Sequence, residues 1–332
     1  MISPGRAYSQ SVCPTSSDCA LKQCSHCIKT GRLRPVCIGV VQRKRGDDMS
    51  VKTVTFSAGR PLPAIGQGTW YMGEKASQRK SEVNALRAGI DLGLTLIDTA
   101  EMYAEGGAEE VVGEAIKGQR DNVFLVSKVY PWNAGGQKGQ AACDASLRRL
   151  GTDHIDLYLL HWRGNYGLDE TITLMERLQQ QGKIGRWGVS NLDYEDMQAL
   201  WREEGGSACA TNQVLYHLAS RGIEFDLLPW CQQQAMPVMA YCPLAQAGRL
   251  RSGLMNHPVV NAIAHNHRAT AAQILLAWVI RHQGVIAIPK AASIEHVNAN
   301  AGALEITLTA EERHKLDNAF PPPTHKLPLD VV

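Results

Sequence analysis

The stretch VFLVSKVYPWNAGGQKGQAACDASLRRLGTDHIDLYLLH, residues 123–161, contains the repeat that decides the fold. It begins with an apolar run at 123–128, continues through an amphipathic stretch at 141–150, and ends with a second apolar run at 155–161. Short apolar runs that alternate with amphipathic stretches are typical of strand–helix–strand units with parallel strands. This stretch therefore predicts one such unit near the middle of the chain.

The same alternation extends over the chain from residue 51 onward. Segments 51–56 and 61–64 are separated by residues 57–60, a spacing that predicts a β-hairpin closing one end of a barrel. Eight strands are then expected at residues 65–70, 95–98, 123–128, 155–161, 186–190, 210–214, 237–241 and 285–288.

Helices are expected between these strands, at residues 77–92, 108–117, 141–150, 170–181, 194–201, 223–234, 270–282 and 294–301. A final helix should begin at the capping sequence Thr309–Glu312 and end before prolines 321–323. Eight strand–helix units predict an α/β protein with a closed (β/α)8 TIM barrel and an N-terminal β-hairpin. The glycine-rich fingerprint G-x-G-x-x-G, typical of the open doubly wound sheet, does not follow the first strand.

The first 48 residues differ in composition from the rest of the chain. They hold eight of the 34 Lys and Arg residues, three of the 32 Asp and Glu residues, and five of the nine cysteines. Met49 then begins a segment that reads like an ordinary start of a protein. We therefore expect residues 1–48 to be a disordered or mis-annotated N-terminal extension, and residues 49–332 to form the barrel.

The cysteine and charge patterns limit which binding partners are expected. Cys24, His26 and Cys27 have a spacing that suits zinc, but no second close pair follows, so no metal site is predicted. The net charge of +2 gives no reason to expect nucleic acid, and no apolar run reaches membrane-spanning length. Scattered cysteines after residue 48 are typical of reduced thiols, so a cytoplasmic protein is expected, and no assembly signal contradicts a monomer.

Four chemically useful side chains lie where barrel enzymes place their active sites, at or just beyond the carboxyl ends of the strands. Asp98, Lys128 and His161 end the second, third and fourth expected strands, and Tyr103 lies in the loop after Asp98. Each alone has an ordinary explanation as a helix cap, a surface charge, a core histidine or a space-filling ring. Their combination on successive strands favours a catalytic set.

These four side chains suit the reduction of a carbonyl group, which needs a hydride at carbon and a proton at oxygen. Tyr103 can supply the proton, and a neighbouring Lys128 is expected to lower the tyrosine pKa from its usual value of about 10. Asp98 would hold the lysine in place. His161 would orient the substrate oxygen and donate a hydrogen bond to it.

From residue 51 to about residue 321, the sequence resembles the aldo-keto reductase superfamily. The motif IDTAEMY, with Asp98 and Tyr103, matches the family pattern, and VSK and LLHW supply Lys128 and His161. The resemblance implies an NADPH-dependent oxidoreductase that reduces small aldehydes or ketones, with Tyr103 as general acid. It also implies a nicotinamide and pyrophosphate site formed by Gly68, Thr69, Asp98, Ser190, Asn191, Gln213, Tyr241, Cys242, Pro243, Leu244 and Gln246.

The resemblance also suggests which cofactor is used. Lys290 matches the lysine that meets the adenosine phosphate of NADPH, and Ser293 and Asn300 match nearby contacts. His296 stands where an arginine is common, and bacterial members often have this form. NADPH is therefore expected, with weaker use of NADH possible.

The substrate is expected to meet aromatic side chains and a short tail. Trp70, Trp132 and Trp162 follow the first, third and fourth strands and should line the substrate pocket with Tyr103 and His161. Only nine residues follow Pro323, so the pocket should be open and tolerant. The sequence is similar to bacterial members that reduce methylglyoxal and other small reactive carbonyls.

Two other functions remain open at this point. One is the reduction of sugar-derived diketo acids of the diketogluconate type, for which Arg163 would supply the positive charge. The other is a non-catalytic nicotinamide-binding regulatory protein, although binding alone needs neither Tyr103 nor Lys128.

Overall fold

The computed structural model of the chain describes residues 52–56 and 59–332. The expected extension 1–48, with Cys24 and Cys27, lies outside the described residues, so its separation from the barrel stays a prediction. A two-stranded antiparallel hairpin comes first and consists of β1 (Thr53–Val54) and β2 (Leu62–Pro63). The expected hairpin is therefore confirmed.

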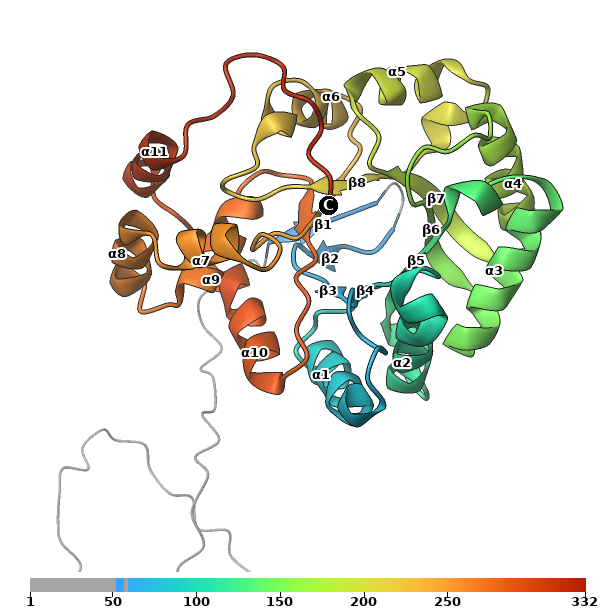
Figure 1. The fold of residues 1–332 in the computed structure, drawn as a ribbon, viewed down its shortest axis with the longest axis horizontal. Helices are drawn as coiled ribbons and strands as arrows, with labels where there is room; N and C mark the ends of the chain where they lie inside the picture. Colours follow the sequence, from blue (N-terminus) through green and yellow to red (C-terminus); the bar gives the residue numbers. More distant parts are fainter. Residues whose placement is uncertain (1–51, 57–58) are drawn as a thin grey trace, which may run out of the picture. The chain divides into compact units, whose positions relative to one another are not determined.

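Eight parallel strands form the centre of the molecule and run in sequence order around the sheet (Figure 1). They are β3 (Gln67–Gly68), β4 (Leu96–Asp98), β5 (Phe124–Val129), β6 (Ile155–Leu160), β7 (Ile184–Ser190), β8 (Asn212–Leu215), β9 (Val238–Tyr241) and β10 (Val285–Ala287). Each lies within two residues of a predicted strand at both ends. The fold is the expected (β/α)8 barrel.

The first and last strands meet and close the sheet. Gly66 N donates to Ala287 O at 2.8 Å, and Gly68 N donates to Pro289 O at 3.1 Å. A side chain at Gly68 could not fit here, because its Cβ would lie 2.6 Å from the Ile288 carbonyl oxygen. Glycine in this strand therefore permits the close approach that joins β3 to β10.

Helices surround the strands on the outside of the barrel (Figure 1). They are α1 (Arg79–Asp91), α2 (Gly107–Ile116), α3 (Gly136–Leu150), α4 (Leu168–Gln180), α5 (Tyr194–Arg202), α6 (Leu227–Gln233), α7 (Arg249–Met255), α8 (Pro258–Asn266), α9 (Ala271–Val279), α10 (Ile294–Gly302) and α11 (Ala310–Ala319). Leu86 and Ile90 of α1 are buried, as their helical spacing predicts. Among the described helices, none is both long and apolar enough to cross a membrane.

Five helical segments differ from the prediction. Helix α3 begins at Gly136, five residues before its predicted start, and α9 ends at Val279, three residues before its predicted end. Helices α7 and α8, between β9 and α9, were not expected. The helix predicted at 223–234 is shorter, because Asp226 starts α6 by accepting a hydrogen bond from Leu227 N at 2.7 Å. The predicted cap of α11 is confirmed, since Thr309 and Glu312 each accept a hydrogen bond from the other's backbone N–H.

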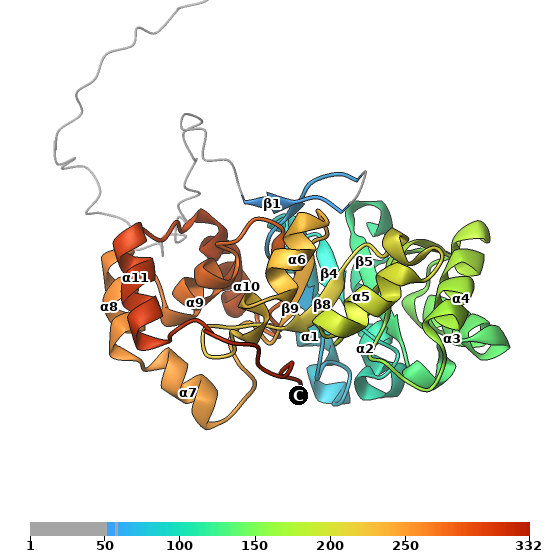
Figure 2. The same ribbon diagram turned by 90° about the horizontal axis from the view of Figure 1, so that it is seen from above.

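The hairpin covers the amino-terminal end of the barrel. Phe56 follows β1 and stacks on Phe124, the first residue of β5, with ring centroids 5.2 Å apart. In Figure 2, β1 lies on one side of the barrel and the end of the chain lies on the other. The carboxyl ends of the strands are therefore left open for a functional site.

Candidate active site

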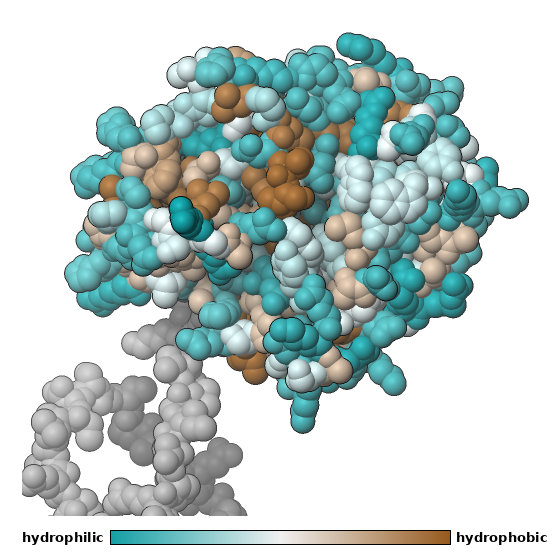
Figure 3. All heavy atoms as spheres, in the orientation of Figure 1, coloured by the Kyte–Doolittle hydropathy of each residue, from teal (hydrophilic) through white to brown (hydrophobic). Residues whose placement is uncertain are grey.

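A cavity of about 300 Å³ opens at the carboxyl ends of the strands. The centre of this face carries hydrophobic surface, and the end of the chain lies beside it (Figures 1 and 3). Sixteen of the predicted site residues line the cavity: Gly68, Thr69, Trp70, Asp98, Tyr103, His161, Trp162, Ser190, Asn191, Gln213, Tyr241, Cys242, Pro243, Leu244, Gln246 and Lys290.

A buried chain of polar contacts connects three of the four predicted catalytic residues. Lys128 Nζ donates to Asp98 Oδ2 at 2.8 Å, to Thr99 O at 2.8 Å and to Tyr103 OH at 3.2 Å. Gln213 Nε2 donates to the other oxygen of Asp98, at 2.7 Å. Lys128 is fully buried behind the cavity wall, and Asp98 and Tyr103 separate it from the cavity. The arrangement holds a positive charge directly behind the phenol.

Burial sets the protonation of these groups. It raises the pKa of Tyr103 well above its ordinary value of 10.0, and the negative charge of Asp98 raises this pKa further. Burial also lowers the pKa of Lys128, and the contact with Asp98 opposes that change. The expected shift of the Tyr103 pKa below its ordinary value is therefore not found, because burial and Asp98 raise it. The lysine charge is already balanced by Asp98, so the loss of water around the phenol dominates.

His161 contributes a neutral ring. Burial lowers its pKa from 6.5 to about 2, and the nearby charge of Lys128 acts in the same direction. Its Nδ1 atom is buried and has no hydrogen-bond partner among the described residues. The other nitrogen, Nε2, is therefore the one that can reach the cavity. A neutral imidazole protonated at Nε2 can donate a hydrogen bond to an oxygen there.

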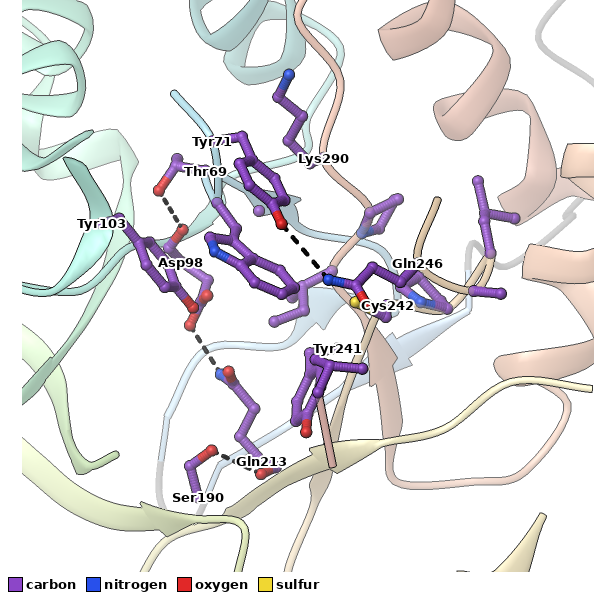
Figure 4. Close-up of a pocket in the computed structure, with 18 of the residues that line it drawn as sticks. Thr69, Tyr71, Asp98, Tyr103, Ser190, Gln213, Tyr241, Cys242, Gln246 and Lys290 are labelled. Atoms are coloured by element: carbon purple, nitrogen blue, oxygen red, sulfur yellow. Dashed lines mark hydrogen bonds between the residues drawn. The ribbon is translucent and has the colours of Figure 1, made fainter. Parts of the chain in front are cut away.

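The floor of the cavity presents several amide and hydroxyl groups. Ser190 Oγ donates to Gln213 O at 2.8 Å (Figure 4). Tyr241 OH donates to Asn191 Oδ1 at 2.8 Å. Asn191 and Cys242 directly follow β7 and β9, and both have positive φ, 57° and 47°. Such backbone strain in residues other than glycine is often concentrated at functional sites.

Aromatic side chains form one wall. Trp70 stacks beside Tyr103, whose ring meets the His161 ring edge to face, and His161 lies 4.9 Å from the Trp162 ring between centroids. Trp132 does not line the cavity. It packs against Trp162 at 5.9 Å between centroids, and 56% of its surface is exposed. Trp132 therefore lies at the outer edge of the wall.

The residues expected to meet the adenosine end are less closely grouped. Lys290 lines the cavity and makes no hydrogen bond or ion pair with another described side chain, whereas Ser293, His296 and Asn300 lie outside it. Ser293 Oγ accepts a hydrogen bond from His296 N at 3.3 Å and so caps α10. Asn300 is buried in the same helix.

Several residues of the cavity were not predicted from the sequence, among them Tyr71, Met102, Arg251 and Val332. Tyr71 directly follows Trp70, so its place in the chain was a usable signal. No sequence signal placed Arg251 or Val332. The short tail returns to the cavity, and Val332 lines it. Asp330 holds it there by accepting a hydrogen bond from Ser220 Oγ at 2.5 Å.

The chain is similar to known proteins over nearly the whole described part. The sequence model of the aldo/keto reductase family matches residues 64–320. Methylglyoxal reductase YeaE of Escherichia coli is 69% identical over 284 residues, which cover 86% of this chain and all of that protein.

Two solved structures agree closely with the fold. The aldo-keto reductase of Klebsiella pneumoniae in complex with NADPH is 67% identical, with a TM-score of 0.84, and the match covers 86% of this chain and all of that one. A second structure from the same organism, in complex with NADP and acetate, is also 67% identical, with a TM-score of 0.83. That match covers 85% of this chain and 99% of the other.

Proposed function

Because this chain belongs to the aldo/keto reductase family, we propose that it reduces small aldehydes and ketones to alcohols with NADPH, methylglyoxal among them. The observation that carries the proposal is the contact of Tyr103 OH with the buried Lys128 ammonium, 3.2 Å away, at the edge of an aromatic cavity. This contact places a proton donor and a supporting positive charge where a carbonyl oxygen can bind.

The cavity has the chemistry that NADPH requires. At one end it offers the Tyr241 ring for stacking and the polar groups of Ser190, Asn191 and Gln213 for an amide. At the other end Lys290 offers a cation with no partner among the described residues, suited to a phosphate. NADPH, when bound, supplies the hydride.

Tyr103 acts as the general acid. Because burial raises its pKa, the phenol keeps its proton at neutral pH and can give it to the oxygen of the substrate as negative charge develops there. Lys128 then stabilises the phenolate through the hydrogen bond that it already donates. Asp98 keeps Lys128 charged and correctly placed, since it accepts one of the lysine's three hydrogen bonds.

His161 orients the substrate. Its pKa of about 2 keeps the ring neutral across the physiological range, so it donates a hydrogen bond without adding a charge. The carbonyl oxygen of the substrate would then lie between two hydrogen-bond donors, the neutral His161 ring and Tyr103. The Trp70 and Trp162 rings then enclose the rest of a small substrate, with Trp132 at the rim.

A small uncharged substrate suits this pocket better than a diketo acid held by Arg163. Arg163 Nη1 forms an ion pair with Asp196 at 2.7 Å, and its side chain does not line the cavity. The positive charge expected to bind a sugar acid is therefore already paired. Methylglyoxal, the substrate in the name of the E. coli relative, needs no such charge.

The decisive experiment follows NADPH absorbance with the purified full chain and methylglyoxal. Wild-type turnover that disappears in Tyr103→Phe, while NADPH binding stays within about twofold, supports the proposed role of the tyrosine. Loss of NADPH binding in this variant would mean that Tyr103 holds the cofactor and is not the acid. If the wild-type protein binds NADPH but reduces no small carbonyl compound, the alternative of a non-catalytic nicotinamide-binding regulatory protein is favoured.

The location and assembly of the protein are part of the same proposal: a monomer in the cytoplasm. The four cysteines of the described residues, Cys143, Cys209, Cys231 and Cys242, are all free, which suits a reducing compartment. Light scattering on the purified chain tests the monomer, and a dimer at micromolar concentration would contradict it.

A further inference from the structure

Arg251 is a second cation of the cavity to which neither the sequence nor the proposed function gives a role. It lies on α7 and lines the cavity together with Cys242 and Leu244. Its guanidinium makes no hydrogen bond or ion pair with another described residue. The charge of Arg251 also acts on the Cys242 thiol, where it opposes the rise in pKa that burial causes. Arg251 therefore lies near the segment that directly follows Tyr241.

The segment between β9 and α7 contains several residues with left-handed backbone. Cys242, Ala245 and Gly248 all have positive φ, at 47°, 59° and 95°. Leu244 and Leu254 are buried and attach the two ends of this segment to the core. These contacts fix the backbone that carries Arg251, while the arginine side chain itself is exposed.

Two cationic side chains of the cavity have no ion-pair partner among the described residues. Lys290 and Arg251 are the only Lys or Arg side chains among the residues described as lining it. The carboxylate of Asp98 is balanced by Lys128, and His161 is neutral. NADPH carries a phosphate on its adenosine and a pyrophosphate in its middle, whereas a small aldehyde carries no charge. One cation suits each of these two anionic groups.

We propose that Arg251 binds the pyrophosphate of NADPH, while Lys290 binds the adenosine phosphate. The inference rests on the proposed function, because it assumes the same cofactor. The nicotinamide end lies at Tyr241 and the phosphate end at Lys290, so the middle of the cofactor must cross the stretch between them. Figure 4 shows Cys242 and Gln246, from the segment that leads into α7, between Tyr241 and Lys290.

A matched control lies on the same helix. Arg249 precedes Arg251 by two residues and is also exposed, but it does not line the cavity. Two residues along an α-helix are separated by about 200° of rotation, so the two arginines point to opposite sides. Substituting either one removes the same charge from the same exposed helix. Only Arg251 should then affect the cofactor.

The test measures cofactor binding directly. NADPH and NADH are titrated into wild type, Arg251→Ala, Arg251→Lys and Arg249→Ala of the full chain, and Kd is taken from the quenching of tryptophan fluorescence. Since both cofactors contain the pyrophosphate, Arg251→Ala should weaken both by the same factor, about tenfold or more, the loss expected for a charge-assisted hydrogen bond. Arg251→Lys should recover part of the loss, and Arg249→Ala should stay within about twofold of wild type.

Each other outcome overturns the inference. Unchanged Kd values in Arg251→Ala mean that the arginine is a solvated surface charge. A loss confined to NADPH assigns Arg251 to the adenosine phosphate, and a loss confined to the KM of carboxylate-bearing substrates assigns it to the substrate. If wild type binds neither cofactor, the proposed function itself fails, which separates that failure from the failure of this inference.

Discussion

The buried pair of Asp98 and Lys128 should stabilise the fold only as a pair. The Lys128 side chain is 0% exposed and the Asp98 side chain 3% exposed. Asp98→Ala would leave the buried ammonium with only Thr99 O and Tyr103 OH, and it would remove the acceptor of Gln213 Nε2. Lys128→Met would leave a buried carboxylate without its counter-charge. Removing one partner of a buried pair costs about 3–5 kcal/mol, because the remaining charge is left without water and without its partner.

The double variant separates the charge from the loss of side-chain volume. In Asp98→Ala/Lys128→Met neither charge remains, so the combined loss should be smaller than the sum of the two single losses by about 2 kcal/mol or more. Urea unfolding in the absence of cofactor measures all four proteins. Thermal midpoints should fall by about 6–10 °C in each single variant, at about 2 °C per kcal/mol for a domain of this size.

An exposed ion pair of nearly equal length serves as the control. Arg163 and Asp196 are 2.7 Å apart, but their side chains are 42% and 37% exposed. The same comparison of two single variants and their double variant should give an interaction energy of about 0–1 kcal/mol for this pair, because water replaces the lost partner. Equal coupling in the two cycles would refute the reasoning, since it would mean that burial adds nothing to the Asp98–Lys128 interaction.

Three further predictions concern pH, the cofactor and the first segment. Burial lowers the pKa of His161 from 6.5 to about 2, so the stability that its neutral ring provides is complete above pH 6.5 and is lost as the pH falls. Between pH 6.5 and about pH 5, the free energy of unfolding measured with urea should fall by about 2 kcal/mol because of this group. This fall should be absent in His161→Gln, and an equal fall in both proteins would contradict the assignment. Lys290→Ala should raise the Kd of NADPH about tenfold and that of NADH much less, and equal changes would remove its assignment to the adenosine phosphate. Deleting residues 1–48 should leave kcat and the Kd of NADPH unchanged, and a large loss would give this segment a role in the enzyme.

The strands could be predicted because burial on both faces makes them continuous apolar runs. β5 and β6 are fully or almost fully buried, and their predicted bounds differ from the observed ones by one residue at most. Helix α7 could not be found in this way, because Leu254 is its only buried side chain and gives no helical stripe. Helix α8 did carry a signal, since Pro258 stands at its start, where proline is favoured.

The inner part of the site could be predicted because it depends on position along the strands alone. Asp98 ends a strand, and the carboxyl ends of all barrel strands meet on one face, so the sequence places it. Trp132, Arg251 and Val332 depend on the paths of loops and tail through space. Trp132 was expected in the pocket and lies at its rim, whereas Val332 was not expected and lines it. The sequence contains no periodic pattern that fixes such paths.

The pKa of Tyr103 could not be predicted either, because it depends on how completely water is removed around the ring. That same removal of water explains why Asp98 is needed. Burial favours the neutral form of both Tyr103 and Lys128, so without a counter-charge the lysine would tend to lose its proton. A neutral lysine could not stabilise the phenolate that forms when Tyr103 gives up its proton. Asp98 opposes the lowering of the Lys128 pKa by burial, but it does not oppose the raising of the Tyr103 pKa. Tyr103 therefore keeps its proton, while Lys128 behind it stays charged.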